Sequence, residues 1–186
     1  MNREPLEPWE TLDRRPVIEN PPWVTVWEEQ VELPDGRVID GWLMFEMPDV
    51  AVIFAMTPDQ HVVVERSYRH GLRGVTLSLP AGHVESDEQP LAAAQRELLE
   101  ETGYTADEWE PLGSFIRDSN HGCGRVFLYL ARNARPVAEP DTDDLEEIRV
   151  ELVSLNELLV AVRQGEFASL GSAAAIGLAI SALHAS

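Results

Sequence analysis

The chain of 186 residues is long enough for one domain with its own core, and its apolar (44%) and charged (25%) fractions are those of an ordinary globular protein. A formal net charge of −19 argues against a nucleic-acid binder, because an acidic surface repels phosphate backbones. A small phosphorylated ligand stays compatible with this charge, since bound divalent cations can invert the local field.

The sequence contains no recognisable targeting or membrane segment. The N-terminus lacks the apolar run of a signal peptide, and the best membrane candidate, SAAAIGLAISAL, is shorter than the roughly 18 apolar residues that a span needs. The single cysteine, Cys123, excludes an internal disulfide and fits a reducing compartment. We therefore expect a soluble cytoplasmic protein without membrane contact.

Residues 1–22 are polar and contain five of the thirteen prolines, which predicts an extended arm with little structure of its own. Two strands joined by a hairpin should follow, because WVTVWEEQVEL and RVIDGWLMFEM flank the turn signal Pro34-Asp35-Gly36. We therefore predict an N-terminal arm and β-hairpin over residues 1–45 and a main domain over residues 46–186.

The main domain begins with strand patterns. VAVIFAMT and HVVVERSY are almost continuous in valine and isoleucine, which indicates strands buried on both faces. GVTLSLPAG is a further short strand that ends at Pro80. Residues 89–102 form the clearest helix, with Pro90 in its first turn and Gly103 in the place of a left-handed C-terminal cap.

Further strands and helices complete the chain. LGSFIRDSN and RVFLYLARN are strand-like and flank the glycine-rich loop NHGCGR, and IRVELVSL is the last strand. Ser154 and Glu157 form a capping box for a helix that ends near Gly165, and a final helix covers roughly residues 170–184. The fold class is therefore α+β, or mixed α/β.

The helix over residues 89–102 has an apolar stripe and an acidic face. At 100° per residue, Leu91, Ala94 and Leu98 share the stripe that should face the core. Glu97, Glu100 and Glu101 share the adjacent face, where like charges destabilise a helix by a few tenths of a kcal/mol per pair.

Solvent, the neighbouring Arg96 or a divalent cation could offset this repulsion. Three carboxylates with a residual water shell suit Mg²⁺, and the small Ala93 would let a ligand approach. The helix alone leaves a solvated face and a metal site equally open. The preceding loop favours the metal site, because Gly82 permits unusual backbone conformations and Glu88 lies at the helix entrance.

Residues 82–104 carry a specific motif. Gly82, five residues, Glu88, seven residues and then RELLEETGY resemble the Nudix box in full, and so many fixed positions in one window make the match specific. The strand order over about residues 45–160 is also similar to the Nudix fold. The resemblance implies an α/β/α sandwich, here with an N-terminal β-hairpin arm.

The resemblance also implies an activity. Nudix proteins typically hydrolyse a nucleoside diphosphate linked to another group, by attack of water on phosphorus with the help of divalent metals. Arg96 would orient a glutamate and Glu88 would support the loop or an outer metal site, both as part of the catalytic machinery together with Glu101. The ligands of Mg²⁺ or Mn²⁺ would be Glu97, Glu100, Glu101 and the backbone carbonyl of Ala81.

The general base is a separate question. In relatives resembling ADP-ribose pyrophosphatases it is often a glutamate on a loop before the last strand, which corresponds here to EPDTDDLEEIRV. We predict Glu146 among the acidic residues of this segment, which are Asp143, Asp144, Glu146 and Glu147. A simple solvated acidic loop is the alternative.

Several features resemble the ADP-ribose and NDP-sugar branch of the family: the hairpin with LPDG, the segment SYRHG, and LPAG before the box. That branch implies a substrate contact for Arg69, for which a surface ion pair is the alternative, and a homodimer formed by exchange of the arm. The tryptophans of the hairpin, Trp23, Trp27 and Trp42, are expected at an interface or in a core rather than stacked on a base.

One feature departs from the ADP-ribose enzymes. Ser119 stands where they commonly have a proline, and DSNHGCGR replaces their Pro-Gly loop. This loop, with His121 and Cys123, is interpreted as shaping the substrate pocket, since two ligands are too few for a metal. The alternatives are hydrolysis of a dinucleoside polyphosphate or nucleoside triphosphate, and a non-catalytic nucleotide-sensing domain, against which the intact box argues.

Overall fold

The computed structural model describes residues 6–141 and 147–185 and groups the chain into two units. The first unit comprises residues 1–48 and 116–125, and the second comprises residues 49–115 and 126–186. No helix in the described part of the chain is long and apolar enough to cross a membrane.

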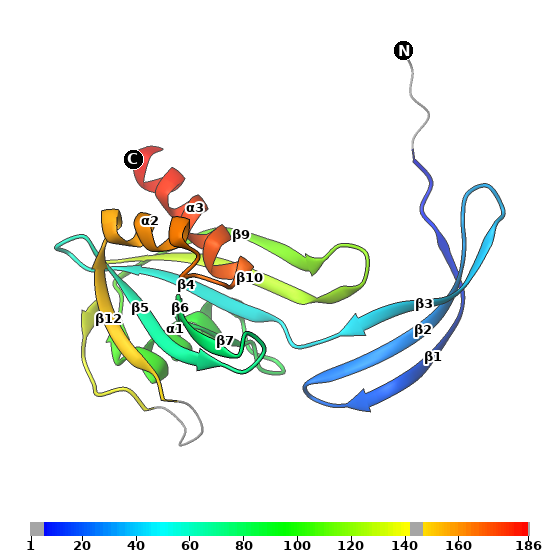
Figure 1. Ribbon diagram of the computed structural model, residues 1–186, viewed down its shortest axis with the longest axis horizontal. Coiled ribbons are helices and arrows are strands. Elements are labelled where there is room, and N and C mark those ends of the chain that lie inside the picture. The colour runs from blue at the N-terminus through cyan, green and yellow to red at the C-terminus, as the bar shows by residue number, and fades with distance from the viewer. Residues whose placement is uncertain (1–5, 142–146, 186) are drawn as a thin grey trace, which may run out of the picture. The chain divides into compact units, whose positions relative to one another are not determined.

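The first unit is built on an antiparallel meander of β1 (Glu10–Asn20), β2 (Val24–Glu32) and β3 (Val38–Glu46) (Figure 1). The predicted hairpin of β2 and β3 is confirmed, and Gly36 in its turn has φ of 80°. The role of this arm in dimerisation stays a prediction.

The expectation that the first 22 residues have little structure was wrong, because β1 pairs with β2 along its whole length. Strand β1 has no buried apolar face, and interactions with side chains of β2 stabilise it instead. Arg15 forms an ion pair with Glu28, and the Arg14 guanidinium lies 4.0 Å from the centre of the Trp27 ring.

The second unit has a mixed sheet of long and short strands. Strand β4 (Val50–Met56) lies parallel to β10 (Gly122–Arg132) and antiparallel to β5 (His61–Arg69) and β7 (Ala81–His83). Strand β5 also pairs antiparallel with β6 (Gly74–Ser78) and β12 (Arg149–Ser154). Strand β9 (Glu108–Asp118) pairs with β10, and the short β8 (Tyr104–Thr105) pairs with β11 (Arg135–Pro136).

Helices cover both faces of this sheet, which confirms the predicted α/β/α sandwich (Figure 1). Helix α1 (Pro90–Thr102) packs on one face, and α2 (Leu155–Gln164) and α3 (Leu170–Ala185) pack on the other. Strand β5 alternates between the faces, since Val62 and Val64 meet α2 and α3 while Val63 meets α1. The same alternation puts Glu65 on the α1 face.

Helix α1 differs from its helical-wheel prediction at two positions. Leu91 is 39% exposed, and Ala93 is fully buried with Ala94 and Leu98. The helix therefore presents two alanines to the sheet, and Ala93 leaves no room for a ligand. The predicted left-handed cap at Gly103 is confirmed (φ 73°), as is the capping box of Ser154 and Glu157 at the start of α2.

Candidate active site

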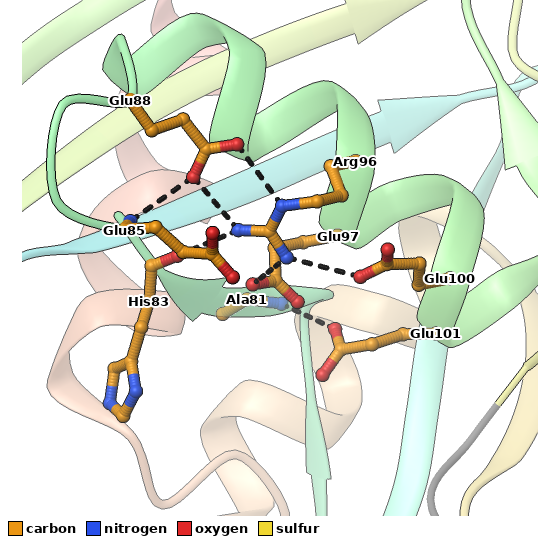
Figure 2. A network of polar contacts seen from close by, with 8 residues as sticks. All are labelled: Ala81, His83, Glu85, Glu88, Arg96, Glu97, Glu100 and Glu101. Carbon is orange, nitrogen blue, oxygen red and sulfur yellow. Dashed lines mark hydrogen bonds and ion pairs between the residues drawn. The ribbon is translucent and has the colours of Figure 1, made fainter.

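The guanidinium of Arg96 lies at the centre of the acidic site on α1 (Figure 2). Its Nε and Nη2 donate to the two carboxylate oxygens of Glu88 at 3.0 and 2.9 Å. Its Nη1 donates to Glu97 at 2.7 Å and to Glu100 at 3.0 Å, and Nη2 also reaches the carbonyl oxygen of His83 at 2.9 Å. One cation therefore holds three carboxylates and the loop that precedes the helix.

Glu88 ties this loop to α1. Besides its paired bonds with Arg96, its Oε2 accepts the backbone N–H of Glu85 at 3.1 Å. The hydrogen bond from Arg96 and that from the Glu85 backbone hold the pKa of Glu88 below its usual range. The contacts of Glu88 are thus those of a residue that supports the loop.

Glu97 lies against the backbone of Gly82. A Cβ atom at residue 82 would come within 1.9 Å of the Glu97 carboxylate carbon. The sequence analysis expected Gly82 to allow an unusual backbone conformation, but Gly82 does not have a positive φ. The glycine is needed because a side chain at this position would have no space. Burial raises the pKa of Glu97, although Arg96 opposes the shift.

We expect Gly82→Ala to displace the Glu97 carboxylate and to lower the metal-dependent hydrolysis that the resemblance implies by about 10–100-fold, the range for disturbed metal-site geometry. The clash involves the far end of a flexible side chain, so the free energy of unfolding should change by less than about 1 kcal/mol. Steady-state kinetics and thermal unfolding measure the two effects.

Gly177→Ala is the control, because a Cβ atom there meets nothing within 4 Å. If Gly82→Ala were as active as this control, the position of the Glu97 carboxylate would not be important for activity.

Glu101 is the most deeply placed carboxyl group of the motif. Its Oε2 accepts the backbone N–H of Ala81 at 2.9 Å. Burial, and then the neighbouring carboxyl of Glu65, raise the pKa of Glu101 to about 9. Ala81 and Glu101, both predicted as metal ligands, are therefore in direct contact.

Glu65 is the site residue that the sequence analysis missed. It is fully buried on β5, and its carboxyl group helps to raise the pKa of Glu101. A glutamate that interrupts the run Val62-Val63-Val64 was the available signal, since alternation along the strand places it on the same face as Val63.

Arg69 also lies on β5 and has an ion pair. Its Nη2 is 3.9 Å from Oε2 of Glu65, and its side chain is about one-third exposed. Arg69 therefore forms an ion pair, although with a buried partner and not at the surface, and its contact with a substrate stays a prediction.

The donors on and beside α1 fit a hard divalent cation. Within residues 6–141 and 147–185 no three histidine, cysteine, aspartate or glutamate side chains are gathered as a metal site, and Nη1 of Arg96 bridges Glu97 and Glu100. Nevertheless, Glu97, Glu100, Glu101 and the adjacent Ala81 offer only oxygen donors, which Mg²⁺ and Mn²⁺ prefer. The space that Gly82 leaves free is filled by one of these carboxylates.

The predicted general base, Glu146, lies outside the described residues, as do Asp143 and Asp144. Glu147 is described and forms an exposed ion pair with Arg149 at 2.7 Å. On the other side of the segment, the N–H of Asp141 donates to the carbonyl oxygen of Glu100 at 2.8 Å. Asp141, the last described residue before this segment, therefore lies against the C-terminal turn of α1.

The glycine-rich loop belongs to the first unit. Gly122, Cys123 and Gly124 have φ of 91°, 70° and 74°, and the His121 ring stacks on Trp42 at 5.5 Å. Trp27 contacts Arg14 and donates to Glu46, whereas Trp23 is 58% exposed. Two of the three tryptophans are thus packed within the first unit.

Comparisons with known proteins match both parts of the chain. The family model described as NUDIX domain matches residues 46–170, and that described as nucleoside diphosphate sugar hydrolase N-terminal domain matches residues 9–42. An ADP-ribose pyrophosphatase of Bacillus subtilis is 29% identical over 82% of this chain and 83% of its own length.

Two further similarities are informative. A methanol dehydrogenase activator of Bacillus methanolicus is 33% identical over 66% of this chain and 69% of its own length. The crystal structure of an ADP compounds hydrolase has a TM-score of 0.84, covers 98% of each chain and is 19% identical. The last similarity shows a shared fold over almost the whole chain.

Proposed function

The chain belongs to the Nudix family, and we propose that it hydrolyses the pyrophosphate bond of a nucleoside diphosphate linked to another group, with ADP-ribose or an NDP-sugar as substrate. The observation that carries this proposal is the arrangement of Glu97 and Glu100 around Arg96, on the same helix as Glu101, which contacts Ala81. The similarity to an ADP-ribose pyrophosphatase and to the N-terminal domain of NDP-sugar hydrolases supports the substrate class.

The chain's own residues have distinct roles in this reaction. Glu97, Glu100, Glu101 and the Ala81 carbonyl would hold Mg²⁺ or Mn²⁺, which when bound neutralises the pyrophosphate and acidifies the attacking water. Arg96 orients the carboxylates, and Glu88 keeps the loop against α1. A chain of net charge −19 has particular need of such local positive charge to accept an anionic substrate.

We assign the general base to Glu146, which would take a proton from the attacking water. Glu146→Gln should lower kcat by about 10²–10⁴-fold, the usual contribution of general base catalysis, without changing Mn²⁺ affinity. The control is Glu147→Gln, since Glu147 is exposed and pairs with Arg149. Equal losses in the two variants, or a weaker affinity for Mn²⁺ in the first, would exclude this assignment.

A panel of nucleotides with Mg²⁺ or Mn²⁺ tests the substrate class. Mass spectrometry should find a nucleoside monophosphate and a sugar phosphate, with ¹⁸O from labelled water in one phosphate. Dinucleoside polyphosphates and nucleoside triphosphates give different products and separate the alternative hydrolases. Absence of turnover on the whole panel would overturn the proposal.

Arg69 is our candidate for a contact with the substrate. Its partly exposed guanidinium lies next to Glu65, close to the acidic residues of α1, and could reach an anionic group there. Arg69→Lys should raise KM more than it lowers kcat, because lysine keeps the charge but not the paired geometry of the guanidinium.

A regulatory domain that binds a nucleotide is the second candidate, because a 33% identical relative is a methanol dehydrogenase activator. Calorimetry that shows nucleotide binding while product analysis shows no hydrolysis would favour it.

We also propose a homodimer formed through the arm, in a cytoplasmic protein. Four apolar residues in β1 or directly before it are each more than 40% exposed: Trp9, Leu12, Val17 and Ile18. Light scattering on the intact chain and on variants with charged residues at Leu12 and Ile18 tests the assembly.

A further inference from the structure

A cavity of about 420 Å³ lies beside α2, on the face of the sheet that α2 and α3 cover. Its volume is within the range of about 300–1,000 Å³ that is usual for sites of small ligands. Helix α1 packs on the opposite face of the sheet. The cavity is therefore separate from the proposed metal site, and the proposed reaction does not use it.

The deeper lining of the cavity is apolar. Leu77 of β6 and Ala161 of α2 are buried in the core, and Val153 of β12 packs against this core. Val160 of α2 also lines the cavity, although it is 49% exposed. An apolar group bound here would remove apolar surface from water, which is favourable.

The outer lining is charged, and its one guanidinium is already engaged by carboxylates. Nε and Nη2 of Arg66 donate to the two oxygens of Glu151 at 2.7 and 3.1 Å. Its Nη1 lies 3.6 Å from Oε2 of Glu166. Since all three guanidinium nitrogens have an anionic partner, Arg66 has little capacity left for an anionic ligand.

Negative charge is in excess around the cavity. Three carboxylates, those of Glu151, Glu157 and Glu166, lie near the single guanidinium of Arg66. Hydrogen bonds from the side chain and backbone of Ser154 lower the pKa of Glu157, which keeps its carboxylate ionised at neutral pH. An apolar lining next to excess negative charge is complementary to an organic cation.

We propose that this cavity binds a small organic cation, in which an ammonium group is attached to an apolar body. The apolar body would contact Leu77, Val153 and Val160, and the ammonium group would lie next to the carboxylate of Glu166. A bare metal ion would find too few oxygen ligands among these apolar side chains. The site goes beyond the proposed hydrolysis and contains none of the residues assigned to it.

Benzylammonium is a suitable probe, because it joins an ammonium group to an apolar ring. A chemical-shift titration of the intact ¹⁵N-labelled chain measures its dissociation constant and identifies the amides that it affects. We expect a dissociation constant of about 1 mM, usual for so small a ligand, and shifts at Val160 and Glu166. Benzyl alcohol and benzoate have a similar ring without a positive charge and should bind at least about fivefold more weakly.

Two variants with matched controls locate the site. Val160→Trp fills the cavity and should weaken binding by about tenfold or more, whereas Val38→Trp changes a valine of similar exposure (47%) on β3, outside the cavity. Glu166→Gln should weaken binding about two- to fivefold, the effect of one partly exposed charge pair. Its control is Glu110→Gln, because Glu110 is similarly exposed (44% against 42%) and pairs with Arg132. Both controls should bind the probe like the wild type.

Equal affinities for benzylammonium and benzyl alcohol would overturn the proposal, because the carboxylates would then contribute nothing to binding. Tighter binding of benzoate would also overturn it, since Arg66 would then act as a receptor for anions. Undiminished binding to Val160→Trp, or shifts confined to α1, would place the probe at the acidic residues of α1 and not in the cavity. Absence of nucleotide hydrolysis would leave all these results unchanged, so the two proposals fail separately.

Discussion

Replacement of Glu101 by glutamine is expected to lower kcat/KM for the nucleotide substrate by about 10³-fold, within the range seen when a key charged group of an active site is removed. An amide has the shape of the carboxyl group but carries no negative charge for Mg²⁺ or Mn²⁺. It also places a donor nitrogen where Glu101 has an acceptor oxygen.

The same substitution should leave the fold intact. Burial, and then the neighbouring carboxyl of Glu65, raise the pKa of Glu101, so its surroundings already disfavour a negative charge. Glutamine has the same shape and is neutral, so the melting temperature in EDTA should hardly change. The substitution should therefore lower the activity without lowering the stability.

Steady-state kinetics at saturating Mg²⁺ and thermal unfolding in EDTA check this result. Glu110→Gln is the control, because Glu110 pairs with Arg132 on β9 and β10 and is not part of the motif. Full activity of Glu101→Gln would show that Glu101 has no role in the reaction. A large fall in the melting temperature would mean that the loss of activity could result from unfolding.

Most of the fold could be predicted because its signals are local. The valine-rich runs of β4 and β5, the turn at Gly36 and the caps at Gly103 and Ser154 act within a few residues of the chain. Strand β1 was missed because it is exposed along its whole length and therefore lacks apolar alternation. It is stabilised by cross-strand partners on β2, such as Glu28 with Arg15.

The site was predicted in part, and its errors have physical causes. A helical wheel groups side chains by angle, but the sheet determines which angle faces inward, so Ala93 took the place of Leu91 in the core. The requirement for Gly82 comes from Glu97. This contact joins residues of different elements, and no periodic pattern reveals it.

Gly103 is the glycine of the motif for which the structure predicts the largest loss of stability. It ends α1 with φ of 73°, a conformation that costs other residues roughly 1–2 kcal/mol. A Cβ atom there would also come within 2.1 Å of the carbonyl oxygen of Ala138, which is backbone and cannot easily yield. Together these effects should lower the free energy of unfolding of Gly103→Ala by about 2–4 kcal/mol.

Gly165→Ala separates the two causes. Gly165 ends α2 with φ of 78°, but a Cβ atom there meets nothing within 4 Å. Gly165→Ala should lower the free energy of unfolding by only about 1–2 kcal/mol, which is the strain of the left-handed conformation. Denaturant unfolding of both variants measures the difference, which is the cost of the clash with Ala138. Equal losses would mean that the backbone at Ala138 moves away freely.

The clash has a consequence for the reaction as well. The Gly103 carbonyl oxygen accepts the N–H groups of Val137 and Ala138 at 2.9 and 3.2 Å, which fixes the chain just before the segment that contains Glu146. A displaced Ala138 should therefore lower kcat even at temperatures where Gly103→Ala is fully folded, whereas Gly165→Ala should retain wild-type kcat. Loss of stability with unchanged kcat would show that residues 137 and 138 do not help to position the proposed general base, Glu146.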